Sequence, residues 1–210
     1  MRRVVFESSV VTPGPQRSCR RRAVSLALCV ALGLLWSTEA SARDRRLPTQ
    51  LRLVILFKAL TYDRNLARQR GKLVVGIVCD KTSSASRALG YETAAELSRM
   101  AGKRVKGLKL SHTLLSVKNG KALTRRLNEH GINVIYLSTA VGRLLPRMRA
   151  LARERGLLII SGEAEHIRQG ASLAVVQRGP KPRILFNLTV AREQGASLDA
   201  RLLSLSDVIF

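Results

Sequence analysis

The sequence predicts an α/β fold: helices flank a mostly parallel sheet, and an antiparallel hairpin lies near the C-terminus. Three observations predict it. From Lys72 onwards, strand-like apolar runs alternate with segments of helical spacing, as in chains that form parallel sheets. The runs are nearly continuous in aliphatic residues, which is typical of strands covered on both faces. Near the end, two apolar runs flank Gly179-Pro180-Lys181-Pro182, which indicates a hairpin with a constrained loop.

The first half of the chain alternates between the two patterns. The predicted elements are an opening helix over 47–66, a strand over 72–79, a helix over 84–101, a weaker strand over 104–110 and, after a polar turn at 118–120, another helix. Leu51, Val54 and Ile55 give the opening helix its spacing. In the last helix, Leu123 and Leu127 stand four residues apart, so they share one face.

The second half shows the alternation more clearly. The predicted elements are strands over 132–137 and 157–160, a helix over 141–152 between them, hairpin strands over 172–177 and 183–187, and a closing helix with a stripe of Leu198, Leu202, Leu205 and Ile209. Pro146 is expected to delay or kink the helix between the strands. No linker or fixed-period repeat interrupts the pattern, so residues 43–210 are expected to form a single domain.

Residues 1–42 have the pattern of a cleavable export signal. Arg20, Arg21 and Arg22 form a positive region, and an apolar run of 14 residues follows over 23–36. Ala40-Ser41-Ala42 is a small-x-small site, so we expect cleavage after Ala42 and a periplasmic protein. The apolar run is shorter than the ~20 residues that span a bilayer, which makes an uncleaved anchor the weaker alternative. A start codon inside this segment is another alternative.

Charge and cysteine content narrow the function classes. The signal contains six arginines and two glutamates, so the net charge falls from +23 to +19 on its removal. In a cytosolic chain this excess of positive charge would suggest nucleic-acid binding. This chain is predicted to be exported and has no visible stacking platform of aromatic residues, which argues against nucleic-acid binding. The favoured explanation for most of the charge is a high-GC genome that places Arg on solvated surfaces. Contact with an anionic membrane surface, with lipopolysaccharide or with an acidic partner is the alternative. Cys79 is the only cysteine after residue 42, so no internal disulfide is expected.

Motifs for catalysis are absent from the sequence. It has no G-x-S-x-G, P-loop or G-x-G-x-x-G motif. His112, His130 and His166 are too far apart in sequence for a local metal site. Glu163 and Glu165 fit the first turn of a short helix better than a catalytic pair. We therefore predict no enzyme activity, no metal and no cofactor, with a hydrolase of dispersed site as the least favoured alternative.

Small polar residues follow three of the predicted parallel strands. Ligands bind at the carboxyl ends of strands in open α/β sheets, where helix N-termini present free N–H groups. A small-ligand crevice is therefore predicted from six residues: Asp80, Thr82, Ser83, Ser138, Thr139 and Ser161. The alternative is that these serines and threonines only cap helices.

The C-terminal third resembles the YfiR/HmsC-type family of exported bacterial regulatory proteins. The resemblance lies in a strand over 157–161, an acidic turn, Gln169-Gly170 before a strand, a further strand that ends near an asparagine, an Ala-Arg helix and a Leu-Leu ending. The matching motif residues are Gly170, Phe186, Asn187, Arg192, Leu202 and Leu203. We interpret them as structural, with Asn187 capping the next helix and Arg192 on its surface.

The resemblance implies a regulatory role without catalysis. Its members are similar to a repressor that binds the periplasmic part of an inner-membrane diguanylate cyclase, which lowers cyclic di-GMP and biofilm formation. It also implies dimers. Two departures weaken the match: Thr61-Tyr62-Asp63 stands where the family often has Trp-Pro, and Asn133 stands where a cysteine is common. Another receptor, such as a histidine kinase, is therefore an alternative partner, and a periplasmic ligand-binding module is the alternative function.

Overall fold

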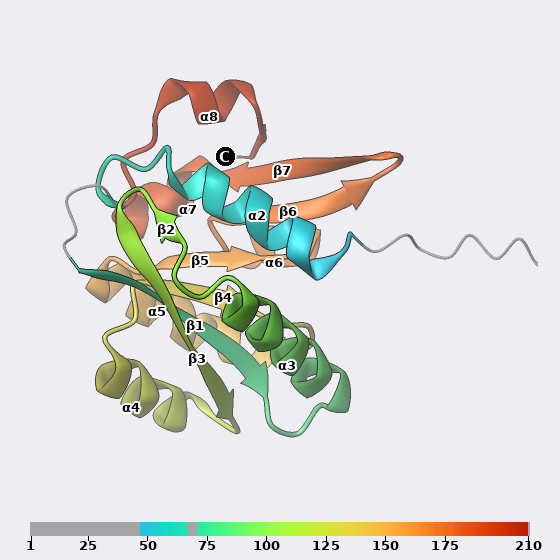
Figure 1. The fold of residues 1–210 in the computed structure, drawn as a ribbon. Coiled ribbons are helices and arrows are strands. Elements are labelled where there is room, and N and C mark those ends of the chain that lie inside the picture. The colour runs from blue at the N-terminus through green and yellow to red at the C-terminus, as the bar shows by residue number, and fades with distance from the viewer. Residues whose placement is uncertain (1–46, 67–70, 210) are drawn as a thin grey trace, which may run out of the picture. The chain divides into compact units, whose positions relative to one another are not determined.

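The computed structural model of this protein describes residues 47–66 and 71–209, which belong to one compact unit (Figure 1). The predicted signal peptide lies outside the described residues. In the part that is described, no helix has both the length and the apolar character needed to cross a membrane.

Eight strands form one sheet in the described part of the chain, in the order β2-β3-β1-β4-β5-β6-β7-β8. Their bounds are β1 Lys72–Asp80, β2 Arg104–Val105, β3 Leu108–Val117, β4 Val134–Leu137, β5 Leu158–Ser161, β6 Leu173–Arg178, β7 Lys181–Asn187 and β8 Asp207–Ile209. The strands from β3 to β6 are parallel, whereas β2 and β7 run antiparallel to β3 and β6. The predicted α/β class with its C-terminal hairpin is therefore confirmed.

Helices cover both faces of the sheet (Figure 1). Helices α2 (Thr49–Leu60), α3 (Ser84–Arg99) and α8 (Ala200–Ser204) pack on one face, where their apolar side chains share a core with Tyr136 and Phe186. Helices α4 (Gly120–His130), α5 (Leu145–Arg155) and α6 (Ala164–Arg168) pack on the other face around Met148 and Ile159. Helix α7 (Leu188–Glu193) follows β7. The strands are thus buried on both sides, as their sequence predicts.

Two sequence predictions need correction at the sheet edges. The strand expected over 104–110 is a hairpin of β2 and β3, because Lys106 and Gly107 both have positive φ and form a tight turn between them. β3 then continues to Val117. The closing helix stops at Ser204, and residues 207–209 pair with β7 as β8.

Local chemistry explains where helices begin and end. The opening helix spans only Thr49–Leu60 of the predicted 47–66. Pro146 lies in the first turn of α5, after a 3-10 turn η2 (Gly142–Leu144), so it delays the helix without kinking it. Gly131 and Gly156 end α4 and α5 in the left-handed conformation that glycine adopts without strain.

Candidate functional site

The sheet has a topological switch point between β1 and β4. The chain moves outward from β1 to β3 and then returns to the other side of β1 as β4. Helix α3, which follows β1, packs on one face, while α5, which follows β4, packs on the other. In such folds, the carboxyl ends of the two strands border a crevice that binds ligands. Asp80 and Ser138 lie at this point, as the sequence predicts.

Asp80 is the centre of a buried polar cluster at the switch point. Its side chain is only 4% exposed and accepts two hydrogen bonds of 2.7 Å from Nε and Nη2 of Arg143. The backbone N–H and the hydroxyl of Thr82 also donate to it, at 2.8 and 2.7 Å. Burial opposes ionisation, but the bonds from Thr82 and Arg143 outweigh it and lower the pKa of Asp80. The carboxylate is therefore ionised and saturated, which suits a structural role better than that of a general base.

Two buried serines continue this cluster towards β4. The hydroxyls of Ser86 and Ser138 are 2.7 Å apart, and Ser138 donates to the carbonyl of Val78. The hydroxyl of Ser86 accepts from the N–H of Asp80. Ser83 caps α3 by accepting from the N–H of Ser86. The crevice is thus closed by hydrogen bonds among its own side chains.

The structure brings four of the six predicted crevice residues into one cluster. Asp80, Thr82, Ser83 and Ser138 are linked directly or through Ser86 and Arg143. Thr139 is half-buried just beyond β4. Ser161 instead forms a separate pair with His166, whose Nδ1 lies 2.6 Å from its hydroxyl.

Sequence reasoning missed Ser86 and Arg143, although each completes the cluster. Ser86 is in the first turn of α3, where a serine usually signals only a cap. Arg143 lies 63 residues from Asp80 and meets it only because β1 and β4 are neighbours. An arginine in the connection after β4, the strand beside one that ends in aspartate, is the signal that could have found the pair.

The motif residues of the C-terminal third hold local structure. Gly170 is buried with φ +109°, a conformation that favours glycine. Asn187 caps α7 by accepting from the N–H of Val190, and Arg192 is exposed on that helix. Phe186 and Leu202 are in the core, whereas Leu203 is only partly buried.

Because His166 is buried, we expect the free energy of unfolding to fall in mild acid. Burial lowers its pKa, against the opposing charges of Glu163 and Glu165, so the folded protein takes up its proton at lower pH than the unfolded chain. Stability is then lost as pH falls below about 6.5, at up to ~1.4 kcal/mol per pH unit. We expect His166→Gln to flatten the dependence of unfolding free energy on pH between 7.5 and 5.5.

Burial also lowers the pKa of His112, so His112→Gln should flatten the same curve in the same direction, and the two variants together separate the contribution of each histidine. A wild-type curve that His166→Gln leaves unchanged would contradict the interpretation.

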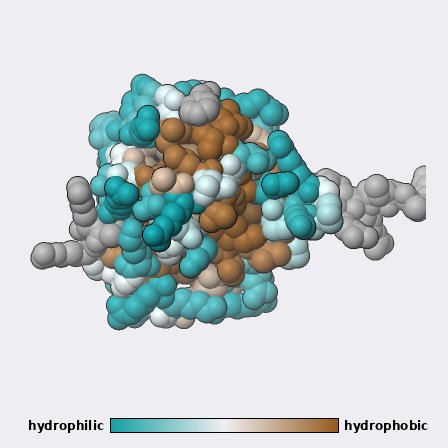
Figure 2. All heavy atoms as spheres, turned by 90° about the horizontal axis from the view of Figure 1, so that it is seen from above, coloured by the Kyte–Doolittle hydropathy of each residue, from teal (hydrophilic) through white to brown (hydrophobic). Residues whose placement is uncertain are grey.

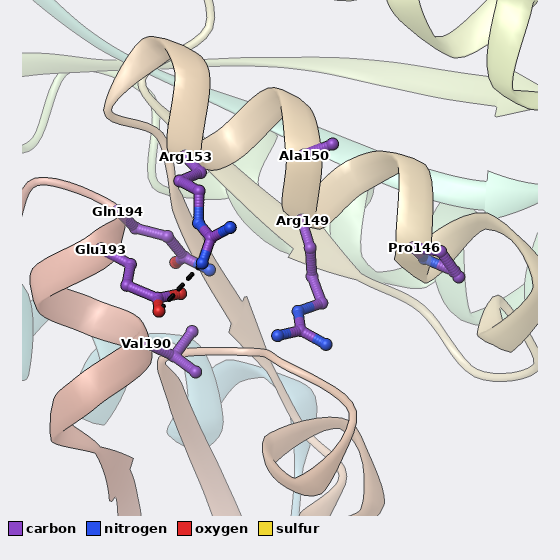
Figure 3. Close-up of a pocket in the computed structure, with 7 residues that line it drawn as sticks. All are labelled: Pro146, Arg149, Ala150, Arg153, Val190, Glu193 and Gln194. Carbon is purple, nitrogen blue, oxygen red and sulfur yellow. Dashed lines mark ion pairs between the residues drawn. The ribbon is translucent and has the colours of Figure 1, made fainter.

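A pocket of about 240 Å³ lies between α5 and α7 (Figure 3). The lining residues are Pro146, Arg149, Ala150, Arg153, Val190, Glu193 and Gln194. Arg153 and Glu193 form an ion pair of 2.9 Å across it. None of the six predicted crevice residues lines this pocket, and its volume is below the ~300–1,000 Å³ that is typical of ligand pockets.

Fold and site together define a doubly wound α/β protein whose switch-point crevice is closed by its own polar side chains. The chain belongs to the YfiR/HmsC-like family, whose model matches residues 49–207. The resemblance found in the sequence, which fits the order of elements over most of residues 47–209 and is most specific in the last 50 or so, is therefore confirmed. Membership favours a regulatory rather than a catalytic role in the periplasm. No curated protein sequence matches this chain significantly.

Two solved structures share the fold at low sequence identity. A conserved domain protein from Vibrio cholerae O1 biovar eltor has a TM-score of 0.54 and 13% identity, over 77% of this chain and 60% of its own. The ABC domain from Streptococcus pneumonia, solved in complex with L-Trp, has a TM-score of 0.57 and 11% identity, over 78% and 62%. This chain thus spans about three fifths of either protein, and the likeness concerns the fold alone.

Among residues 47–66 and 71–209, no group of three or more His, Cys, Asp and Glu side chains could hold a metal ion. Cys79 is free and fully buried, and burial raises the pKa of its thiol. A thiol in this environment is a poor nucleophile.

Proposed function

We propose that this protein is an exported, non-enzymatic regulator that binds the periplasmic part of an inner-membrane signalling protein and represses it. The diguanylate cyclase class is the first partner to test. Membership of the YfiR/HmsC-like family carries the proposal. The saturated Asp80 cluster is consistent with it, because a carboxylate held by Arg143 and Thr82 is not free to act on a substrate.

An exposed apolar surface supports partner binding. Leu51 and Val54, three residues apart on α2, are 44% and 45% exposed, and Leu205 beyond α8 is 62% exposed. Figure 2 shows apolar side chains gathered on the face seen from above, where α2 and α8 lie in Figure 1. We call Leu51, Val54 and Leu205 the α2–α8 surface. Apolar patches rimmed by polar residues typically bind other proteins.

Basic residues gather on a different side. Residues 118–155, which include α4 and α5, contain nine Lys and Arg but only two acidic residues, Glu129 and Glu154. A groove of about 950 Å³ between these helices is lined by Lys121, Arg125 and Arg147, among others. Because α4 and α5 cover the opposite face of the sheet from α2, this charge supports contact with an anionic membrane surface while the α2–α8 surface binds the partner.

The test compares wild-type protein with Leu51→Ser/Val54→Ser. Both side chains are exposed, so the fold should be unaffected, within about 0.5 kcal/mol per site. Crosslinked pull-down from solubilised membranes, followed by mass spectrometry, should recover one signalling protein through its periplasmic domain. Loss of two apolar contacts should weaken this binding about tenfold or more. Overexpression of the wild type should lower cyclic di-GMP, and the double variant should not.

Tyr91→Ser is the matched control, because Tyr91 is 60% exposed on α3, outside the α2–α8 surface. It should retain both partner and repression. Light scattering of the wild type and the double variant distinguishes partner binding from dimerisation. If the wild type is a dimer, the double variant is a monomer and the variant still binds the partner, the α2–α8 surface joins two copies of this chain. Recovery of no signalling protein by the wild type would refute the proposed function.

A further inference from the structure

Arg52 is a buried charge that no carboxylate of the described residues pairs with. It lies in the first turns of α2 and is only 8% exposed. One of its terminal nitrogens donates to the carbonyl of Leu47 at 3.1 Å, and the other lies 3.5 Å from the hydroxyl of Tyr136. Its Nε is buried and has no hydrogen-bond partner in the part of the chain that the structure describes. None of the ion pairs within residues 47–66 and 71–209 includes Arg52.

The guanidinium of Arg52 lies against Gly162, just beyond the carboxyl end of β5. A Cβ at position 162 would be 2.7 Å from Cδ, Cζ and Nε of Arg52, so only glycine leaves room for the arginine there. Leu137 pairs with Ser161 at the ends of β4 and β5, so Ser138 and Gly162 directly follow the same pair of strand ends. Tyr136 and Ser138 face the same side of the sheet, because Tyr136 lies in the core beneath α2 and α3, and Ser138, just beyond β4, bonds Ser86 of α3. Arg52 therefore borders the switch-point cluster.

Burial of the Arg52 charge in this way lowers the stability of the protein when no ligand is bound. A buried guanidinium normally has a carboxylate partner or a full set of hydrogen bonds, since an uncompensated buried charge is strongly destabilising. The 3.5 Å contact with Tyr136 is at the limit of hydrogen bonding, so it compensates little. Nε and a terminal nitrogen of arginine together form the fork that binds both oxygens of a carboxylate.

We propose that Arg52 anchors a binding site for a small organic carboxylate at the carboxyl ends of β4 and β5. The carboxylate accepts from Nε and a terminal nitrogen of Arg52, and the phenol of Tyr136 turns to donate to it. A single arginine among apolar residues balances one negative charge, so a monoanion is favoured over phosphate. This site does not depend on the proposed partner binding and adds a ligand to the regulator.

The test measures thermal unfolding and calorimetric binding of the purified, exported protein. The probes are acetate, each free L-amino acid and inorganic phosphate, with chloride used to hold the ionic strength constant. At a hundredfold excess over its Kd, at least one carboxylate should raise Tm by roughly 5 °C. Phosphate should not. A screen in which no carboxylate raises Tm, or in which phosphate does so equally, overturns the proposal.

Two variants distinguish a ligand-binding role of Arg52 from a purely structural one. Arg52→Met removes the charge and keeps the apolar stem, so binding should weaken at least tenfold while the Tm of the ligand-free protein stays equal or rises. A purely structural Arg52 predicts a lower Tm instead. Gly162→Ala keeps the charge but displaces the guanidinium, and it should abolish the Tm response even if Arg52→Met fails to fold.

Lys58→Met, an exposed basic residue on the same helix, is the control and should respond to the carboxylate like the wild type. If Arg52→Met and Gly162→Ala also respond like the wild type, the site lies elsewhere and the proposal is wrong.

Discussion

Asp80→Ala is expected to lower the free energy of unfolding by about 3 kcal/mol. The substitution removes a carboxylate that is 4% exposed and holds Arg143 and Thr82 through four hydrogen bonds. It leaves the N–H of Thr82 and the guanidinium of Arg143 without their partner at the switch point. Loss of one member of a buried pair costs about 3–5 kcal/mol, and partial exposure of Arg143 at 55% places this case at the lower end. Urea denaturation measures the change.

A double-mutant cycle with Arg143→Ala isolates the ion pair from the rest of the cluster. We expect a coupling energy of about 1–2 kcal/mol, because the arginine is half in solvent and its charge is screened. Ser84→Ala, an exposed residue at the start of α3, is the matched control and should change stability by less than about 0.5 kcal/mol. A cost for Asp80→Ala that is no larger than this control would show that Asp80 does not hold the crevice closed.

The pH dependence of this effect has a defined sign. The pKa of Asp80 is lower in the folded protein than in the unfolded chain, so the stabilisation is complete above about pH 4 and is lost as pH falls through the lower, folded value. Asp80→Asn cannot ionise. The difference in stability between wild type and Asp80→Asn should therefore shrink between pH 5 and pH 2.5, in contrast to the histidine effect, which lies at higher pH.

The alternating pattern in the sequence predicts the parallel centre of the sheet well, because β1, β4 and β5 are buried on both faces and so consist almost entirely of apolar residues. The edges are harder to predict. Near Lys106 the run reads as one strand, since a lysine with positive φ is uncommon and only Gly107 hints at a turn. At the C-terminus, Ile209 fits the apolar stripe of the predicted closing helix, yet it pairs with Asn187 of β7 in the sheet.

The same limit applies to the crevice. Asp80 and Ser138 could be predicted because strand ends meet at one edge of a parallel sheet. Arg143 and Arg52 could not, because their roles depend on which strand and which helix become neighbours in the fold. Arg52 is a single basic residue in an otherwise apolar helix segment, a pattern that predicts a solvent-facing position. Only the packing of α2 on the sheet places it beside Tyr136 of β4 and Gly162 after β5.

Gln194→Ala should have the second large effect on stability, again about 3 kcal/mol. Gln194 is 2% exposed at the end of α7. Its side-chain oxygen accepts from the N–H of Ile159 in β5 at 3.0 Å, and its side-chain nitrogen donates to the carbonyl of Gly170 at 3.1 Å. Alanine leaves both buried backbone groups unsatisfied, at about 1–3 kcal/mol each. Arg192→Ala, an exposed change on the same helix, is the control and should be nearly neutral.

Gln194→Glu tests the two hydrogen bonds separately. An ionised carboxylate can still accept from the N–H of Ile159, but it cannot donate to the carbonyl of Gly170. One carboxylate oxygen would then face the carbonyl oxygen of Gly170, and the two would repel each other. Protonation restores the donor, so the folded variant should favour the protonated acid and the pKa of the new carboxyl should be raised. Its stability relative to wild type should therefore improve as pH falls from 8 to 5, whereas that of Gln194→Ala should not change. If the two variants show the same dependence on pH, the bond to Gly170 contributes little and α7 is held mainly by its apolar side chains, with Ala191 in the core.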